Sequence, residues 1–247
     1  MNSLFKFYEV GGKIRDELLG LSNKDVDYVA VPCKEALDQG LTACEMFTVL
    51  CDYLQNEGFE IFLITRECFT IRAKFPNGYK YQGVADFVMA RKEVGYIPGT
   101  RTPIVEPGNL YDDLSRRDFT VNALAKDPDT GEIIDYFDGL QDLKDRILRT
   151  PLNPETTFND DPLRILRGIR FAITKGFSLD DNVERIIISY PYHIKMRVVS
   201  EERIREELYK CFKSSTIETL GYLYKFVELL EYIFENTNLW LKPTNEK

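Results

Sequence analysis

The feature that most constrains the fold is a change of sequence pattern near residue 150. Before it, short apolar runs typical of strands are interleaved with segments of helical periodicity. After a proline-bracketed linker, every pattern from Asp161 onward is helical. The chain is therefore expected to join a mixed α/β domain to an all-α region.

The first part carries recognisable element signals. Asn77-Gly78, between two β-rich runs, favours a hairpin with a tight type I′ turn. A long Pro- and Gly-rich segment that follows is expected to be irregular, as functional loops often are. The expected strands are Phe5–Val10, Val26–Val31, 60–64 and 131–137, the expected helices are Lys13–Leu19, 43–57, 116–125 and 139–148, the hairpin spans 68–90 and the irregular segment 91–109.

Charge and cysteine content restrict the class of protein. The formal net charge of −8 argues against broad electrostatic attachment to nucleic acid or to an anionic membrane, although Lys and Arg outnumber Asp and Glu over residues 164–213. The five cysteines show no metal-ligand spacing and are expected to be reduced thiols. With no signal-peptide pattern and no membrane-spanning apolar run, a cytoplasmic location is expected.

Gly11-Gly12 stands between the first expected strand and helix. Glycines there let the backbone approach a ligand closely, and the N–H groups that begin the helix suit a phosphate. Arg15, one turn into the helix, can add a charge-assisted contact. The pattern favours a phosphate-binding turn, although ordinary strand–turn–helix connections share it.

Asp25 and Asp27 are spaced to share one face of a strand. Two carboxylates so close repel each other unless a cation lies between them, and Mg²⁺ prefers carboxylate oxygens together with substrate phosphates. The alternative is a pair of solvated aspartates at a strand end. Beside the glycine turn, the pair favours a nucleoside triphosphate site with Mg²⁺ as cofactor.

At these residues the sequence resembles class II nucleotidyltransferases of the polymerase-β superfamily, the family of tRNA CCA-adding enzymes and bacterial poly(A) polymerases. The resemblance covers roughly residues 5–213 and rests on five motifs in family order. They read "GGKIRDELLGLSNKDVDYV", "RRDFTVNALA", "GEIIDYFDGLQDLKDRILR", "NDDPLRILRGIRFA" and "SEERIREELYKCF".

The resemblance implies an α+β fold: a polymerase-β-like head with a mixed β-sheet and flanking helices, then an all-α neck and a short helical C-terminal region. The implied domains are a catalytic head at 1–149, a nucleotide-selecting neck at 150–213 and a truncated body remnant at 214–247.

The family selects its base with an Asp-x-x-Arg pair, which matches Asp161 and Arg164 here. An aspartate can accept from the exocyclic amino group of cytosine or adenine while an arginine donates to the ring nitrogen. Uracil and guanine reverse this pattern and would leave buried groups unpaired. Read without the family, the same helix is equally consistent with a solvated basic face.

Further site residues follow from the resemblance. It implies nucleotide contacts by Arg117, Asp118 and Asn122, and by Arg167 and Arg170. Asp86 and Glu106 compete equally as a third carboxylate near the metals.

The implied function is transfer of C, A or both from CTP and ATP to an RNA 3′-hydroxyl, in the first instance the CCA end of tRNA. A poly(A) polymerase and a partial CC- or A-adding enzyme are alternatives within the family. A catalytically silent RNA-binding or regulatory module, and a transferase acting on protein or small-molecule hydroxyls, are alternatives outside it. The acidic, apolar C-terminal segment reads either as a cap on the neck or as a surface for a homodimer or another partner.

Overall fold

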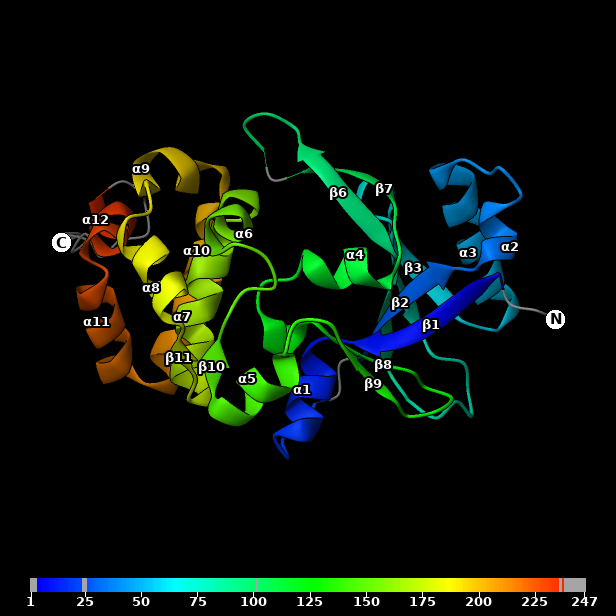
Figure 1. Ribbon diagram of the computed structural model, residues 1–247, viewed down its shortest axis with the longest axis horizontal. Coiled ribbons are helices and arrows are strands. Elements are labelled where there is room, and N and C mark those ends of the chain that lie inside the picture. The colour runs from blue at the N-terminus through cyan, green and yellow to red at the C-terminus, as the bar shows by residue number, and fades with distance from the viewer. Residues whose placement is uncertain (1–3, 24–25, 101, 236, 238–247) are drawn as a thin grey trace, which may run out of the picture. The chain divides into compact units, whose positions relative to one another are not determined.

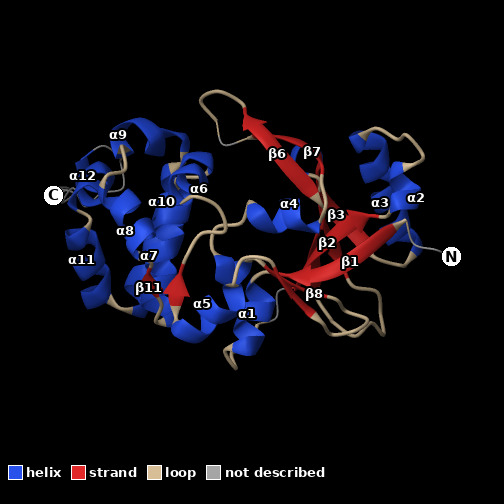
Figure 2. Cartoon of the chain, viewed as in Figure 1, coloured by secondary structure: helices blue, strands red, loops and turns tan. Residues whose placement is uncertain are grey.

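The computed structural model describes residues 4–23, 26–100, 102–235 and 237 (Figure 1). They form two compact units, one from the chain up to Leu143 and one from Lys144 onward, with Gly99 and Thr100 grouped with the second. Strands dominate the first unit and helices the second (Figure 2). None of the helices in the described ranges combines the length and apolar composition that crossing a membrane requires.

The first unit is built on a seven-stranded mixed sheet, which confirms the α+β head that the resemblance implied. Its strand order is β3-β4-β5-β2-β1-β8-β9, and among the described strands of this sheet only β2 and β5 pair in parallel. The strands are β1 Phe5–Val10, β2 Val26–Pro32, β3 Glu60–Thr65, β4 Thr70–Lys74, β5 Val84–Met89, β8 Leu124–Lys126 and β9 Ile133–Asp135.

Helix α3 (Ala43–Asn56) covers one face of this sheet. It begins with a capping box, in which the Thr42 hydroxyl accepts from the Glu45 N–H and the Glu45 carboxylate accepts from the Thr42 N–H. The apolar side of the helix packs on the sheet in a cluster that includes Phe47, Leu50, Tyr28, Phe87 and Ile71.

The opposite face of the sheet packs against helix α4 (Leu110–Ser115). Leu110 and Leu114 of this helix share a second cluster with Val29 of β2. Because successive residues of a strand point to opposite faces, Asp27 lies on the Val29 face and Tyr28 on the α3 face.

The hairpin expected around Asn77-Gly78 is confirmed, since β4 and β5 pair antiparallel. The prediction of a tight two-residue turn is wrong. The Phe75 N–H donates to the Gly83 carbonyl, so the connecting loop spans residues 76–82.

Residues 91–109, expected to be irregular, instead form a second hairpin of β6 (Arg91–Tyr96) and β7 (Pro103–Pro107), a separate antiparallel sheet. The prolines misled the prediction because they occupy the first and last positions of β7, where a strand of a two-stranded sheet tolerates them. A register shift between Glu93 and Gly95 accommodates the glycine.

The prediction of a helix over 116–125 is also wrong. Helix α4 ends at Ser115, a 3-10 turn spans Thr120–Asn122, and β8 pairs with both β1 and β9. Strand pairing on two sides outweighs the helical preference of Ala123, Leu124 and Ala125 at the end of this segment.

The described part of the second unit is helical apart from one short parallel pair, β10 (Ile147–Leu148) with β11 (Ser178–Leu179). The expectation that everything after Asp161 is helical therefore fails at β11. The division at 149 and 213 stays a prediction. The remaining α-helices among the described residues are α1 Gly12–Leu18, α2 Lys34–Leu37, α5 Gly139–Asp145, α6 Pro154–Asp160, α7 Leu163–Lys175, α8 Asp181–Ile188, α9 Tyr192–Lys195, α10 Glu201–Ser214, α11 Thr216–Lys225 and α12 Val227–Glu235.

Candidate active site

The turn between β1 and α1 brings three groups of the candidate site together. Gly11 has φ 76°, in the region that favours glycine, and Gly12 begins helix α1. A Cβ placed on Gly11 would lie 2.9 Å from Arg117 Nη1 and 3.8 Å from Asp27 Oδ2. The glycine therefore leaves room for a guanidinium and a carboxylate that approach the same stretch of backbone.

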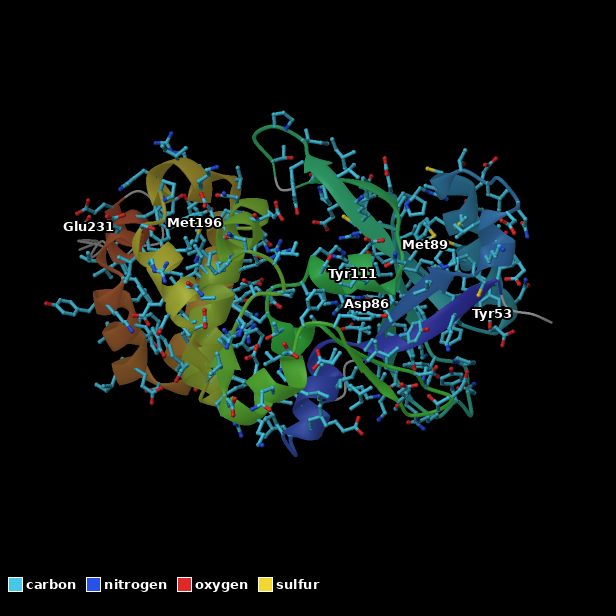
Figure 3. All side chains as sticks on the ribbon, in the orientation of Figure 1. Tyr53, Asp86, Met89, Tyr111, Met196 and Glu231 are labelled. Carbon is cyan, nitrogen blue, oxygen red and sulfur yellow. The ribbon has the colours of Figure 1, made fainter. Side chains whose placement is uncertain are left out.

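Asp27 belongs to a row of charged side chains that crosses three strands. It stands in register with Asp86 on β5, the residue labelled in Figure 3, and Asp86 stands in register with Arg72 on β4. Arg72 donates from Nε to Asp86 Oδ1 and from Nη2 to Asp86 Oδ2, both at 2.7 Å. The three side chains line a hollow of about 440 Å³.

The other carboxylates predicted for this site are placed differently. Asp25 lies outside the described residues. Glu106 is exposed on β7, in the separate two-stranded sheet, where its register partner is Lys92. Of the two candidates for a third carboxylate, the structure brings Asp86 and not Glu106 into register with Asp27.

The carboxylate pair suits a divalent cation. Aspartate oxygens are ligands that Mg²⁺ prefers, and Asp27 and Asp86 offer them from adjacent strands of one hollow. Within the described ranges there is no group of three or more His, Cys, Asp or Glu side chains able to hold a metal. The described residues thus offer two carboxylates of the kind that Mg²⁺ binds.

Arg15 is buried and already engaged. Its guanidinium donates to both carboxylate oxygens of Asp16, at 2.8 and 2.9 Å, and through Nη1 to Asn122 Oδ1. Asn23 also donates to Asp16, at 2.8 Å. Arg15 thus fixes Asn122 beside helix α1.

Arg116 and Arg117 share the fully buried carboxylate of Asp113. Arg117 Nη2 donates to Asp113 Oδ2 at 3.0 Å, and Arg117 Nη1 donates to the Asn122 carbonyl at 3.4 Å. Burial opposes ionisation of Asp113, but the two guanidinium groups prevail and hold its pKa below the ordinary value. Asp113 therefore anchors Arg117 next to the glycine turn.

Asp118 and Asn122 form a buried pair. Asp118 Oδ1 accepts from Asn122 Nδ2 and from the Phe119 N–H, each at 2.9 Å. Together with Arg15, these contacts orient the Asn122 amide, which puts three residues named by the resemblance in one network of the first unit.

Asp161 and Arg164 lie where helix α7 begins. Asp161 is in the link between α6 and α7, and its Oδ1 accepts from the Leu163 N–H at 3.0 Å. Arg164 Nη1 donates to the Thr157 carbonyl at 3.2 Å. Both side chains are partly exposed, on a helix whose opposite side is buried in the core.

Arg167 and Arg170 pack on the ring of Phe171, with guanidinium carbons 5.6 and 4.2 Å from its centroid. Arg170 Nε also forms an ion pair with Glu207 of α10, a side chain that is almost fully buried. Arg170 therefore joins two helices of the second unit.

Asp113 and Arg72 were not predicted as site residues from the sequence. Asp113 precedes the two arginines by three and four positions, a spacing that predicts ion pairs on a helix and could have been used. Arg72 carried no comparable signal, because its pairing with Asp86 depends on the register of β4 against β5.

Comparisons with known proteins indicate the family of the chain. The family model described as poly A polymerase head domain matches residues 7–149. Nucleotidyltransferase lcsQ of Purpureocillium lilacinum is 35% identical over 217 residues, which are 83% of this chain and 35% of that protein. The A-adding tRNA nucleotidyltransferase of Aquifex aeolicus is 34% identical over 233 residues, which are 92% of this chain and 26% of that protein.

A solved structure is similar over nearly the whole chain. The Thermotoga maritima CCA-adding enzyme complexed with tRNA(CCA) has a TM-score of 0.70 and 26% identity, covering 97% of this chain and 50% of that one. This chain thus spans half or less of the length of each of these three proteins.

Proposed function

We propose that this chain, which belongs to the class II CCA-adding enzyme and poly(A) polymerase head family, transfers C, A or both from CTP and ATP to an RNA 3′-hydroxyl. The favoured acceptor is the CCA end of tRNA. The observation that carries the proposal is the meeting of the Gly11 backbone, the Asp27 carboxylate and the Arg117 guanidinium around one point.

The triphosphate is assigned to this meeting point. The backbone N–H of Gly12 and the guanidinium of Arg117 suit its oxygens, whereas Gly11, whose N–H donates to the Leu124 carbonyl, leaves room for their approach. Asp113 keeps Arg117 oriented without neutralising all its donors. Arg15, Asp118 and Asn122 hold the wall of the site, with the Asn122 amide fixed from both sides.

Asp25 and Asp27, with Asp86 as the third carboxylate, are the residues that would hold Mg²⁺. When bound, Mg²⁺ neutralises charge on the phosphates and favours deprotonation of the attacking hydroxyl. The chain contributes positioning and fixed charge, and phosphoryl transfer needs no covalent nucleophile from the protein.

Base choice is assigned to Asp161 and Arg164. The Asp161 carboxylate suits the amino group shared by cytosine and adenine, and Arg164 suits the neighbouring ring nitrogen. Arg167 contributes to the same exposed side of α7, and Arg170 supports it through Glu207. A poly(A) polymerase or a partial adding enzyme would use the same residues.

The experiment supplies purified protein with Mg²⁺, each nucleoside triphosphate separately, and labelled tRNAs that lack the last one, two or three nucleotides. CCA addition predicts C and then A with termination, whereas a poly(A) polymerase predicts long A tails on many RNAs. Asp27→Ala should abolish incorporation, and Asp52→Ala, an exposed carboxylate on α3, should not. Absence of incorporation into every RNA by the parent protein would contradict the proposal.

A further inference from the structure

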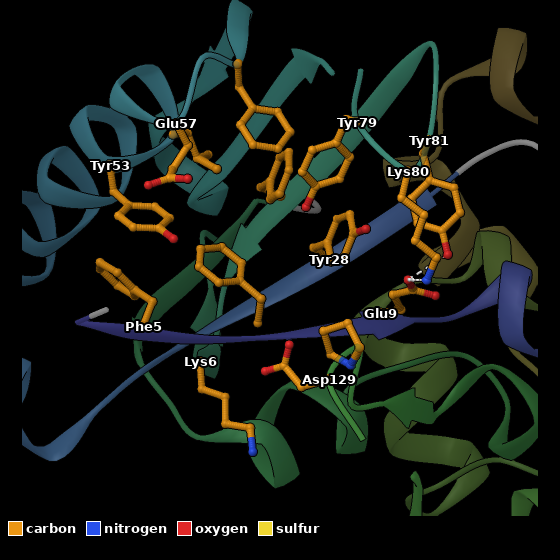
Figure 4. A pocket seen from close by; sticks show the side chains of 15 residues that line it. Phe5, Lys6, Glu9, Tyr28, Tyr53, Glu57, Tyr79, Lys80, Tyr81 and Asp129 are labelled. Carbon is orange, nitrogen blue, oxygen red and sulfur yellow. Dashed lines mark hydrogen bonds and ion pairs between the residues drawn. The ribbon is translucent and has the colours of Figure 1, made fainter. Parts of the chain in front are cut away.

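The first unit contains a second and larger hollow, of about 600 Å³, which is in the size range of small-molecule sites (Figure 4). Most of its lining is aromatic. The rings come from β1, β2, α3, the link between α3 and β3, the loop after β4 and β5, and they include Tyr28, Tyr53, Phe59, Tyr79, Tyr81 and Phe87.

This hollow is separate from the candidate active site. Tyr28 and Phe87 line it, and each directly follows an aspartate of the charged row on the same strand. Side chains of successive strand residues point to opposite faces, so the aromatic hollow and the Asp27–Asp86 hollow lie on opposite faces of one sheet.

Tyr28 places a polar group in the lining of the hollow. The residue is 5% exposed. Burial, together with the nearby charge of Glu9, raises the pKa of Tyr28, so the phenol stays neutral and able to donate. A neutral phenol in the lining can donate a hydrogen bond to an acceptor on a ligand.

The charges of the hollow argue against a cationic ligand. Its buried carboxylate, Glu9, accepts from the Tyr81 hydroxyl at 2.8 Å and lies 3.6 Å from Lys13 Nζ and 3.8 Å from Lys80 Nζ. The same two ammonium groups stand 3.3 and 4.9 Å from the centroid of the Tyr81 ring. A further cation would therefore meet an occupied ring and a compensated carboxylate.

A flat, uncharged ring with polar edges suits the remaining features of the hollow, its aromatic rings and the Tyr28 hydroxyl. We propose that the aromatic hollow binds a nucleobase, stacked on the half-exposed ring of Tyr79, with an edge hydrogen-bonded to the Tyr28 hydroxyl. Lys80, whose side chain is 68% exposed, stands at the rim for an attached phosphate. The base comes either from a free nucleotide or from an unpaired residue of RNA, and the site is independent of the proposed catalysis.

The test titrates the full chain in EDTA with adenosine and, separately, with an adenylate pentanucleotide, followed by NMR. Tyr79→Leu should weaken both by about tenfold through lost stacking. Tyr28→Phe keeps the ring and should weaken both by about threefold through one lost hydrogen bond. The control is Tyr224→Leu, an 81% exposed ring on α11, which should change neither.

Further arms separate the sources and the sites. If the pentanucleotide binds more tightly than adenosine, and Lys80→Ala reduces this difference, the ligand is RNA. Equal binding of the two probes identifies a free nucleotide. Arg164→Ala should keep adenosine binding. The proposal is overturned if that variant loses it, if Tyr79→Leu binds like the parent, or if tetramethylammonium binds in a Tyr79-dependent manner and adenosine does not.

Discussion

Arg72 and Asp86 face each other across β4 and β5, joined by two hydrogen bonds of 2.7 Å that use both oxygens of the carboxylate. Asp86 in turn stands in register with Asp27. Arg72 therefore compensates one of the two adjacent carboxylates, and a bound cation would have to share Asp86 with it.

Replacing Arg72 should slightly lower the stability of the fold and raise its affinity for a divalent metal ion. Arg72→Met removes the guanidinium but keeps an unbranched side chain, so the carboxylates repel each other and attract a cation more strongly. Because the pair is partly exposed, the loss in unfolding free energy should be only about 0.5 kcal/mol. Affinity for Mn²⁺, measured by electron paramagnetic resonance, should rise by roughly threefold to tenfold.

Lys74→Met is the matched control, since Lys74 lies on the same strand with its own exposed partner, Glu60, at 4.0 Å. It should leave Mn²⁺ affinity unchanged. Equal Mn²⁺ affinity in the Arg72 variant and the parent would show that the ion pair does not restrain Asp86.

A second prediction concerns the glycine turn. Gly11→Ala imposes a positive φ on alanine, at roughly 1–2 kcal/mol, and also drives its Cβ to 2.9 Å from Arg117 Nη1. Gly20→Ala carries the same kind of backbone strain, with φ 70°, but its Cβ would meet nothing within 4 Å. Both should lower the melting temperature, and only Gly11→Ala should abolish nucleotidyl transfer. Parallel losses of activity in the two variants would argue against a special role for the turn.

The pKa of Asp113 predicts a pH dependence. Because it is lower in the folded protein, the stability that Asp113 contributes is fully present above its unfolded-state pKa of about 3.9 and is lost as pH falls through the folded value. Asp113→Asn should cost about 3 kcal/mol at pH 7, since it leaves Arg116 and Arg117 without their shared carboxylate. Urea denaturation should show this difference shrinking below pH 4.

The exposed Asp52→Asn serves as the control for that series and should stay close to the parent at every pH. A gap between Asp113→Asn and the parent that keeps its full size down to pH 2 would mean that the carboxylate charge is not what stabilises the arginines.

Arg164→Ala should relax base choice more than it weakens triphosphate binding. Incorporation of U and G relative to C and A should rise by at least about tenfold, since a group that reads the base edge is lost. The readout is single-nucleotide extension with each triphosphate, and Arg185→Ala, exposed on α8, is the control. Retained selectivity in Arg164→Ala would remove this residue from base reading.

Local signals predicted much of the first unit correctly. The strand–glycine–helix pattern at its start is found as β1, Gly11 and α1, because turn chemistry and burial periodicity agree there. The short β8 was missed because its pairing with β1 depends on a partner distant in sequence. The β6–β7 hairpin was missed although its strands are close in sequence, because its Pro and Gly residues favoured an irregular segment.

The candidate site was likewise predicted only in part. The resemblance named Arg117 and Asn122, which the structure joins in one network, but sequence could not show that Arg15 is already committed to Asp16. Likewise, the spacing of arginines along α7 does not reveal that Arg170 turns toward Glu207, since that partner lies on another helix.

The alternation of β2 has a consequence for how this protein can change. Asp27 and Tyr28 are neighbours in sequence that serve opposite sides of one sheet, as are Asp86 and Phe87 across the parallel pair. Inserting or deleting one residue within either strand would exchange the two sets, placing rings among the carboxylates and carboxylates in the apolar core. Length variation in this family should therefore be confined to the loops around β2 and β5, whereas the strands tolerate only substitution.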